Sequence, residues 1–137
     1  MSRWPVIVFA AVVGLLIRVP LLAHHGSAAF DTGKTVVLKG TVKAWLYSNP
    51  HCLLRLEVTD ANGKVVEWVA ETAAPQALRL IGWYRTAIAP GDVITIFVYA
   101  TKTGNPAGRL NRIFLANGTV LHDTQLGGET GGGYRPQ

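Results

Sequence analysis

The sequence predicts a mostly β domain, and three observations carry this prediction. Apolar and polar residues alternate along several short segments, which is the period of half-buried strands and not of helices. Clusters of Gly, Pro, Asn and Asp separate these segments, as turns between strands require. Only residues 75–82 have the spacing of a short amphipathic helix.

The first 23 residues have the composition of a secretory signal peptide. Arg3 gives a basic start, an uncharged apolar run follows over residues 4–17, and Ala23 offers a small residue at the cut. This run is too short for a spanning helix, which needs about 20 apolar residues. We therefore expect residues 1–23 to be removed from a periplasmic or secreted bacterial protein. Membrane contact is expected only through an uncleaved leader.

Removal of the leader defines the rest of the chain. Residues 24–34 form an N-terminal segment, residues 35–122 the β domain, and residues 123–137 a Gly-rich tail that we expect to be disordered. Eleven basic residues then face eight acidic ones, a net charge of +3 that is too small to indicate a nucleic-acid partner. Cys52 is the only cysteine, so the fold has no internal disulfide.

The first strand is expected over residues 35–47, with two distinct faces. The inner face consists of Val36, Leu38, Val42, Ala44 and Leu46. The outer face consists of Lys39, Thr41, Lys43, Trp45 and Tyr47.

A hairpin is expected to follow, from Cys52 to Thr59 and back over residues 65–72. A three-residue loop with Gly63 in the left-handed region pairs Asp60 with Lys64. The buried pairs are then Leu54 with Ala70, Leu56 with Trp68, and Val58 with Val66. A register shifted by one residue would bury Glu67 and Glu71 instead.

The remaining elements complete the fold class. Residues 75–82 predict a helix of about two turns that plugs one end of the sheet, with Ala77, Leu78 and Ile81 as its apolar stripe. Strands are expected over residues 93–100, 110–115 and 119–121. This order predicts a small OB-like barrel, closed or partly open, of five to six antiparallel strands with one short helix between strands 3 and 4.

A set of short motifs runs through the chain in a fixed order. They are His24-His25 with Phe30-Asp31, then Leu38-Lys39-Gly40-Thr41-Val42, Asn49-Pro50-His51, Ala74-Pro75 with Leu78, Gly82-Trp83 and Pro90-Gly91-Asp92. In this order they resemble a bacterial family of small exported proteins that is catalogued only as a domain of unknown function. The chain departs from that pattern at Gly26 and at Cys52-Leu53, where a bulkier or aromatic pair is expected. The resemblance implies an exported β-barrel and no established activity.

Cleavage after Ala23 would make His24 the first residue, which suggests a metal site. A terminal histidine offers its amine, whose pKa is about 8, and its ring nitrogen to one metal as a chelate. The ring of His25 or of His51 can supply a third nitrogen. Copper(II) binds nitrogen ligands most tightly among the divalent first-row metals, so copper is the expected ion.

The hairpin register adds Glu71 to this candidate site. It places His51 opposite Ala73 and diagonal to Glu71, at a separation of about 7 to 8 Å. Glu71 would then bind the metal directly or orient the His51 ring. The alternatives are that Glu71 pairs with Arg55 at the surface and that His51 only caps the second strand.

A binding module without metal chemistry is the competing hypothesis. Trp45, Tyr47, Lys43 and Arg55 would share the outer barrel face and bind a polyanionic or sugar ligand of the envelope, or an exported protein partner. Export argues against nucleic acid. The simplest alternative is that these are ordinary surface side chains.

Among the hypotheses, an enzyme has the thinnest support from the sequence. It contains no Gly-rich phosphate loop, nucleophile elbow, Cys-Xaa-Xaa-Cys or His-Glu-Xaa-Xaa-His motif. Copper monooxygenases that attack polysaccharides also begin with histidine, but they are larger and have a different sandwich fold, so the likeness is an analogy. Metal carriage or storage is the more economical hypothesis.

Overall fold

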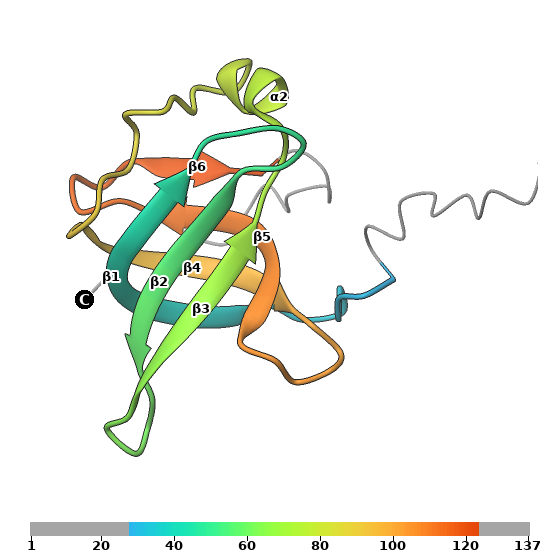
Figure 1. Ribbon diagram of the computed structural model, residues 1–137, viewed down its shortest axis with the longest axis vertical. Coiled ribbons are helices and arrows are strands. Elements are labelled where there is room, and N and C mark those ends of the chain that lie inside the picture. Colours follow the sequence, from blue (N-terminus) through green and yellow to red (C-terminus); the bar gives the residue numbers. More distant parts are fainter. Residues whose placement is uncertain (1–27, 124–137) are drawn as a thin grey trace, which may run out of the picture.

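The computed structural model describes residues 28–123, and these residues form strands joined by tight turns and one short helix (Figure 1). The expected leader, His24, His25 and the tail beyond residue 123 lie outside the described residues. No helix within residues 28–123 is long and apolar enough to cross a membrane. The elements are β1 (Val36–Leu46), β2 (Leu53–Thr59), β3 (Val65–Glu71), α2 (Pro75–Arg79), β4 (Val93–Ala100), β5 (Ala107–Phe114) and β6 (Val120–His122).

Five of these strands close into a barrel. Their order is β3-β2-β1-β4-β5, and β3 pairs with β5 to complete the ring, while β6 extends the sheet beyond β5. The pairing of β3 with β5 is parallel, so the barrel is mixed and not wholly antiparallel as expected. The reason is geometric: a closed ring of five strands cannot alternate direction at every pair. The mostly β fold with a helix between the third and fourth strands is confirmed.

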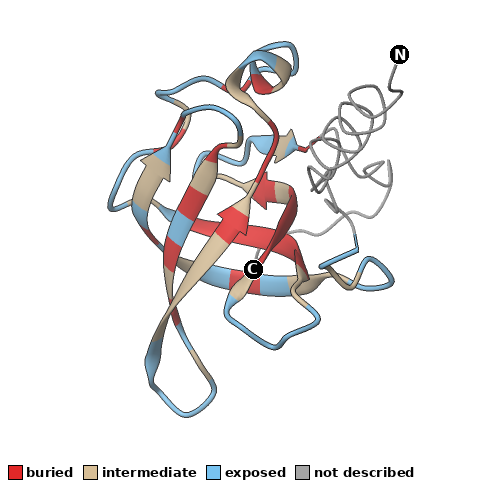
Figure 2. Ribbon diagram, turned by 45° about the vertical axis from the view of Figure 1, so that its right-hand side comes forward, coloured by how far each residue is buried: buried red, intermediate tan, exposed pale blue. Residues whose placement is uncertain are grey.

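The hairpin of β2 and β3 has the predicted register. Val58 lies opposite Val66, and Leu56 lies opposite Trp68. The Asp60 amide donates to the carbonyl oxygen of Lys64 at 2.8 Å. Figure 2 shows buried residues recurring at every second position along β2, so the side-chain alternation that predicted the strand also fixes its inner face.

A bulge in β1 changes the face on which its last residues lie. Val42 lies opposite Leu56, but Ala44, two residues later, lies opposite Arg55, so one strand carries an additional residue at Lys43. Such an insertion reverses the inward and outward alternation of everything that follows it.

The bulge turns Trp45 and Tyr47 toward the interior. Tyr47 is only 8% exposed and Trp45 packs against the buried core, whereas Leu46 is 46% exposed. The prediction that both aromatic residues lie on the outer face, with Leu46 inside, is therefore wrong. Two large aromatic rings bury more apolar area than Ala44 and Leu46 would, and this favours the bulged register.

Helix α2 is shorter than expected, and Leu78 is the last residue of its predicted apolar stripe that lies in the core. Leu78 is fully buried, but Ile81 is 38% exposed and does not join the core. The Trp83 amide donates to the Leu78 carbonyl oxygen at 3.0 Å, which turns the chain out of the helix. Trp83 then enters the core with no exposed surface.

Candidate functional site

His51 and Glu71 meet where β2 begins and β3 ends. Leu53 pairs with Glu71, and the Cys52 amide donates to the Ala73 carbonyl oxygen at 3.1 Å, which continues the ladder past the strand ends. This register brings His51 Nδ1 to 3.1 Å from Glu71 Oε1. The predicted proximity of the two side chains is confirmed, while their binding of a metal stays a prediction.

The surroundings of the His51 ring define which nitrogen carries its hydrogen. Nδ1 lies 3.1 Å from the Thr72 carbonyl oxygen and 3.1 Å from Glu71 Oε1, which are both acceptors, and 3.4 Å from the donor Arg109 Nη1, so the two acceptors are its nearer neighbours. We therefore assign the ring hydrogen to Nδ1. The lone pair is then on Nε2, which has no hydrogen-bond partner among residues 28–123. The His51 side chain is 34% exposed, so this nitrogen can meet a ligand.

Arg109 ties the same site to the interior. Its Nη1 lies 3.2 Å from Glu71 Oε1, and its Nη2 lies 2.9 Å from Asp123 Oδ2. The Arg109 and Asp123 side chains are only 5% and 2% exposed. The parallel pairing places Glu71 directly opposite Arg109, so closure of the barrel assembles this network.

The sequence reasoning missed Arg109 because it began the last long strand at Leu110. The partners Glu71 and Arg109 are 38 residues apart, and no local motif links them. Only the parallel closure of the barrel brings them together.

Glu71 is placed to orient the His51 ring. Among the described residues, the Arg109 guanidinium faces the carboxylates of Glu71 and Asp123. Glu71 Oε1 already faces both Arg109 and His51 Nδ1, which suits a carboxylate that orients the ring. Within residues 28–123 no group of three or more His, Cys, Asp or Glu side chains is placed to hold a metal.

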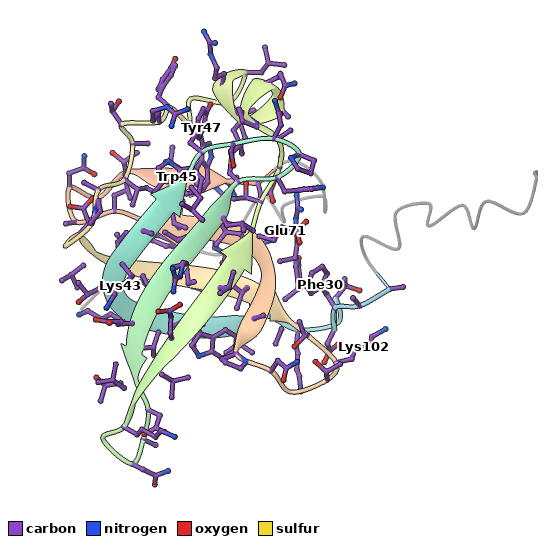
Figure 3. The ribbon with its side chains drawn as sticks, in the orientation of Figure 1. Phe30, Lys43, Trp45, Tyr47, Glu71 and Lys102 are labelled. Atoms are coloured by element: carbon purple, nitrogen blue, oxygen red, sulfur yellow. The ribbon has the colours of Figure 1, made fainter. Side chains whose placement is uncertain are left out.

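The expected pairing of Glu71 with Arg55 is not formed. Arg55 on β2 instead pairs with Glu67 on β3, and Lys43 on β1 pairs with Glu57 on β2. Both cations therefore have a carboxylate partner on a neighbouring strand. Figure 3 shows Lys43 lower on β1, while Trp45 and Tyr47 lie at the upper end of the strand. The structure therefore does not assemble these four predicted ligand-binding residues into one outer surface.

The first described residues are tied to the connection between β4 and β5. Phe30 forms a β-bridge with Thr101, and the Lys102 amide donates to the Ala29 carbonyl oxygen at 3.0 Å. The Lys102 ammonium also donates to the Ala28 carbonyl oxygen at 3.0 Å. Figure 3 shows Phe30 and Lys102 on the same side of the barrel as Glu71.

Cys52, His122 and Tyr47 have structural roles in the barrel. Cys52 is fully buried in the core, as expected, and burial raises the pKa of its thiol. His122 is exposed on β6, and its backbone carbonyl accepts a hydrogen bond from Trp83 Nε1 at 3.0 Å. Burial also raises the pKa of the Tyr47 hydroxyl, which donates to backbone carbonyls around α2.

Comparisons with curated proteins and with solved structures found no match. A family model described as "Family of unknown function (DUF6152)" matches residues 14–111. The matched range includes His24, His25, His51, Glu71 and Arg109 and ends within β5. Because the match spans more than half of the chain, the protein belongs to this family of unknown function.

Proposed function

We propose that this protein binds one copper ion in the bacterial envelope, with His51 as the ligand fixed on the barrel. The observation that carries the proposal is the orientation of the His51 ring. Its Nδ1 faces the Thr72 carbonyl oxygen and Glu71, and with the ring hydrogen on Nδ1 the lone pair is on Nε2. A metal-bound histidine characteristically donates the N–H of its other ring nitrogen to a carboxylate or a backbone carbonyl.

The remaining ligands of the proposed site come from the N-terminus. After cleavage, His24 supplies its amine and a ring nitrogen, and His25 offers a further ring. Three residues lie between His24 and Ala28, and the four extended steps that join them span at most about 14 Å. Since Ala28 is held by Lys102 on the side of the barrel where Glu71 lies, the terminal histidines are proposed to fold back toward His51.

Glu71 and Arg109 are proposed to act through His51. Glu71 holds the ring nitrogen, and Arg109, anchored on Asp123, holds Glu71. Loss of such a supporting group typically weakens metal affinity by about 10- to 100-fold. The proposed role is carriage or storage of the metal, with no catalytic step.

The alternative function, a ligand-binding or interaction module on the outer face of β1 and β2, has less geometric support. Trp45 and Tyr47 point inward, and Lys43 and Arg55 are each neutralised by a glutamate. A polyanionic ligand would have to displace both ion pairs.

The test uses the exported protein with one equivalent of copper(II), followed by intact-mass measurement under native and denaturing conditions. The proposal expects a denatured mass that begins at His24 and a native mass that retains one copper. A copper competition titration then compares His24→Ala and His51→Ala with the control His122→Ala. Each of the first two variants is expected to weaken binding at least about tenfold. A retained wild-type affinity in His51→Ala would overturn the proposal.

A further inference from the structure

The connection that follows α2 displays apolar side chains at the surface. Leu80 is 87% exposed, Tyr84 is 54% exposed and Ile81 is 38% exposed. Figure 1 shows α2 and the chain that leaves it projecting from one end of the barrel. Single exposed apolar residues are ordinary, but a group of three within five positions at a projecting end indicates contact with something apolar.

The buried residues on either side impose this exposure. Leu78 and Trp83 are both fully buried, and Trp83 Nε1 is anchored on the His122 carbonyl oxygen. The Tyr47 hydroxyl lies 2.9 Å from the Pro75 carbonyl oxygen and 3.2 Å from that of Trp83. Leu80 and Ile81 lie between these fixed points, so neither can turn into the core without displacing one of them.

The only charged residues between Glu71 and Asp92 are two arginines. Arg79 precedes Leu80, and Arg85 follows Tyr84. The sequence has no Asp or Glu between Glu71 and Asp92. Arg85 donates to the Tyr47 carbonyl oxygen at 3.1 Å, which holds this guanidinium at the same end of the barrel.

We infer that residues 79–85 form an anchor that docks on an anionic phospholipid surface. Leu80 and Ile81 would enter the boundary between headgroups and acyl chains, Tyr84 would lie at headgroup depth, and Arg79 and Arg85 would face lipid phosphates. The sequence led us to expect membrane contact only through an uncleaved leader, whereas this contact is made by the folded domain.

The size and shape of the patch favour a lipid surface over a protein partner. A stable protein interface engages about 20 to 30 residues a side, whereas attachment to a lipid surface scales with the apolar area that enters the interface plus the attraction of basic residues to anionic lipids. An open depression of about 570 Å³, lined in part by Tyr47, Arg79 and Leu80, adjoins the projection. It offers room for a headgroup beside Arg79.

The experiment is cosedimentation of the exported protein, its N-terminus verified by mass, with two kinds of vesicle. One kind is phosphatidylcholine alone, and the other also contains phosphatidylglycerol. The inference expects binding to the anionic vesicles only, and less binding at high salt because the arginine contribution is screened. Leu80→Ser is expected to weaken binding about tenfold or more, since the leucine no longer leaves water. Arg79→Gln is expected to weaken it less.

The matched control is Val65→Ser, which removes an apolar side chain that is 59% exposed in the β2–β3 hairpin. It should bind vesicles like the wild type. Leu80→Ser and Val65→Ser should both keep the wild-type unfolding midpoint, because exposed substitutions usually change stability by no more than about 0.5 kcal/mol. Absence of binding to anionic vesicles, or equal binding by Leu80→Ser and the wild type, would overturn the inference. The copper titration is unaffected by either result.

Discussion

Replacement of Arg109 by methionine is the sharpest test of the network behind His51. The guanidinium lies 2.9 Å from Asp123 and 3.2 Å from Glu71, and the Arg109 and Asp123 side chains are 5% and 2% exposed. Removing one partner of a buried ion pair typically costs about 3 to 5 kcal/mol. For a domain of this size 1 kcal/mol corresponds to roughly 4 to 8 °C, so the midpoint of thermal unfolding should fall by at least about 12 °C.

The assay is urea unfolding followed by tryptophan fluorescence, to which Trp45, Trp68 and Trp83 contribute. Glu71→Gln is a graded comparison, because that side chain is 36% exposed and its pairing should contribute only about 1 kcal/mol. The double variant Arg109→Met with Asp123→Leu removes both buried charges and should recover most of the lost stability. If Arg109→Met lowers the free energy of unfolding by less than about 1 kcal/mol, the reasoning about a buried ion pair is wrong.

Three further outcomes follow from the core. Gly40→Ala should destabilise the protein by about 1 to 3 kcal/mol in denaturant unfolding, because a Cβ there would overlap the Glu57 carbonyl oxygen. Gly33→Ala is the control, because a Cβ there would make only an ordinary contact with Asp31 Oδ1 at 3.4 Å. Trp83→Ala should lower the free energy of unfolding by about 3 to 5 kcal/mol, because it removes a fully buried ring. A loss below about 1 kcal/mol would contradict the role of Trp83 in closing the α2 end of the barrel. Burial raises the pKa of the Cys52 thiol, so the folded state keeps the proton longer than the unfolded state. Stability should therefore fall as pH rises above about 8.5, and Cys52→Ala should flatten this fall; an equal fall in both proteins would refute it.

The parts of the fold that the sequence predicts are those set by local alternation and turn chemistry. In the β2–β3 hairpin, a slip of one residue would bury Glu67 and Glu71, so a single register is favoured and is the one observed. The left-handed glycine of its turn, Gly63, has the expected positive φ of 79°.

The bulge at Lys43 escaped prediction for an equally local reason. Both possible inner sets at the end of β1 are apolar, Ala44 with Leu46 and Trp45 with Tyr47, so alternation cannot choose between them. The choice depends on the space that the barrel end offers, where the ring centroids of Trp45 and Trp83 lie 5.8 Å apart with the rings tilted by 39°. That space exists only after the chain following α2 has folded over it.

The candidate site also has one part that the sequence predicts and one part that it does not. His51 and Glu71 belong to one hairpin, so their proximity follows from its register and is confirmed at 3.1 Å. Arg109 and Asp123 join them only through the parallel closure of β3 on β5, a contact between distant parts of the chain. Long-range closure is what residue spacing alone does not encode.

The central claim is that His51 binds copper together with the N-terminal histidine. Electron paramagnetic resonance of the exported protein, loaded with one equivalent of copper(II), tests it most directly because nitrogen hyperfine structure reports the ligands. We predict a tetragonal copper(II) signal with at least three nitrogens, one of which is lost in His51→Ala and retained in His122→Ala. A spectrum that is identical in His51→Ala and the wild type would contradict the account.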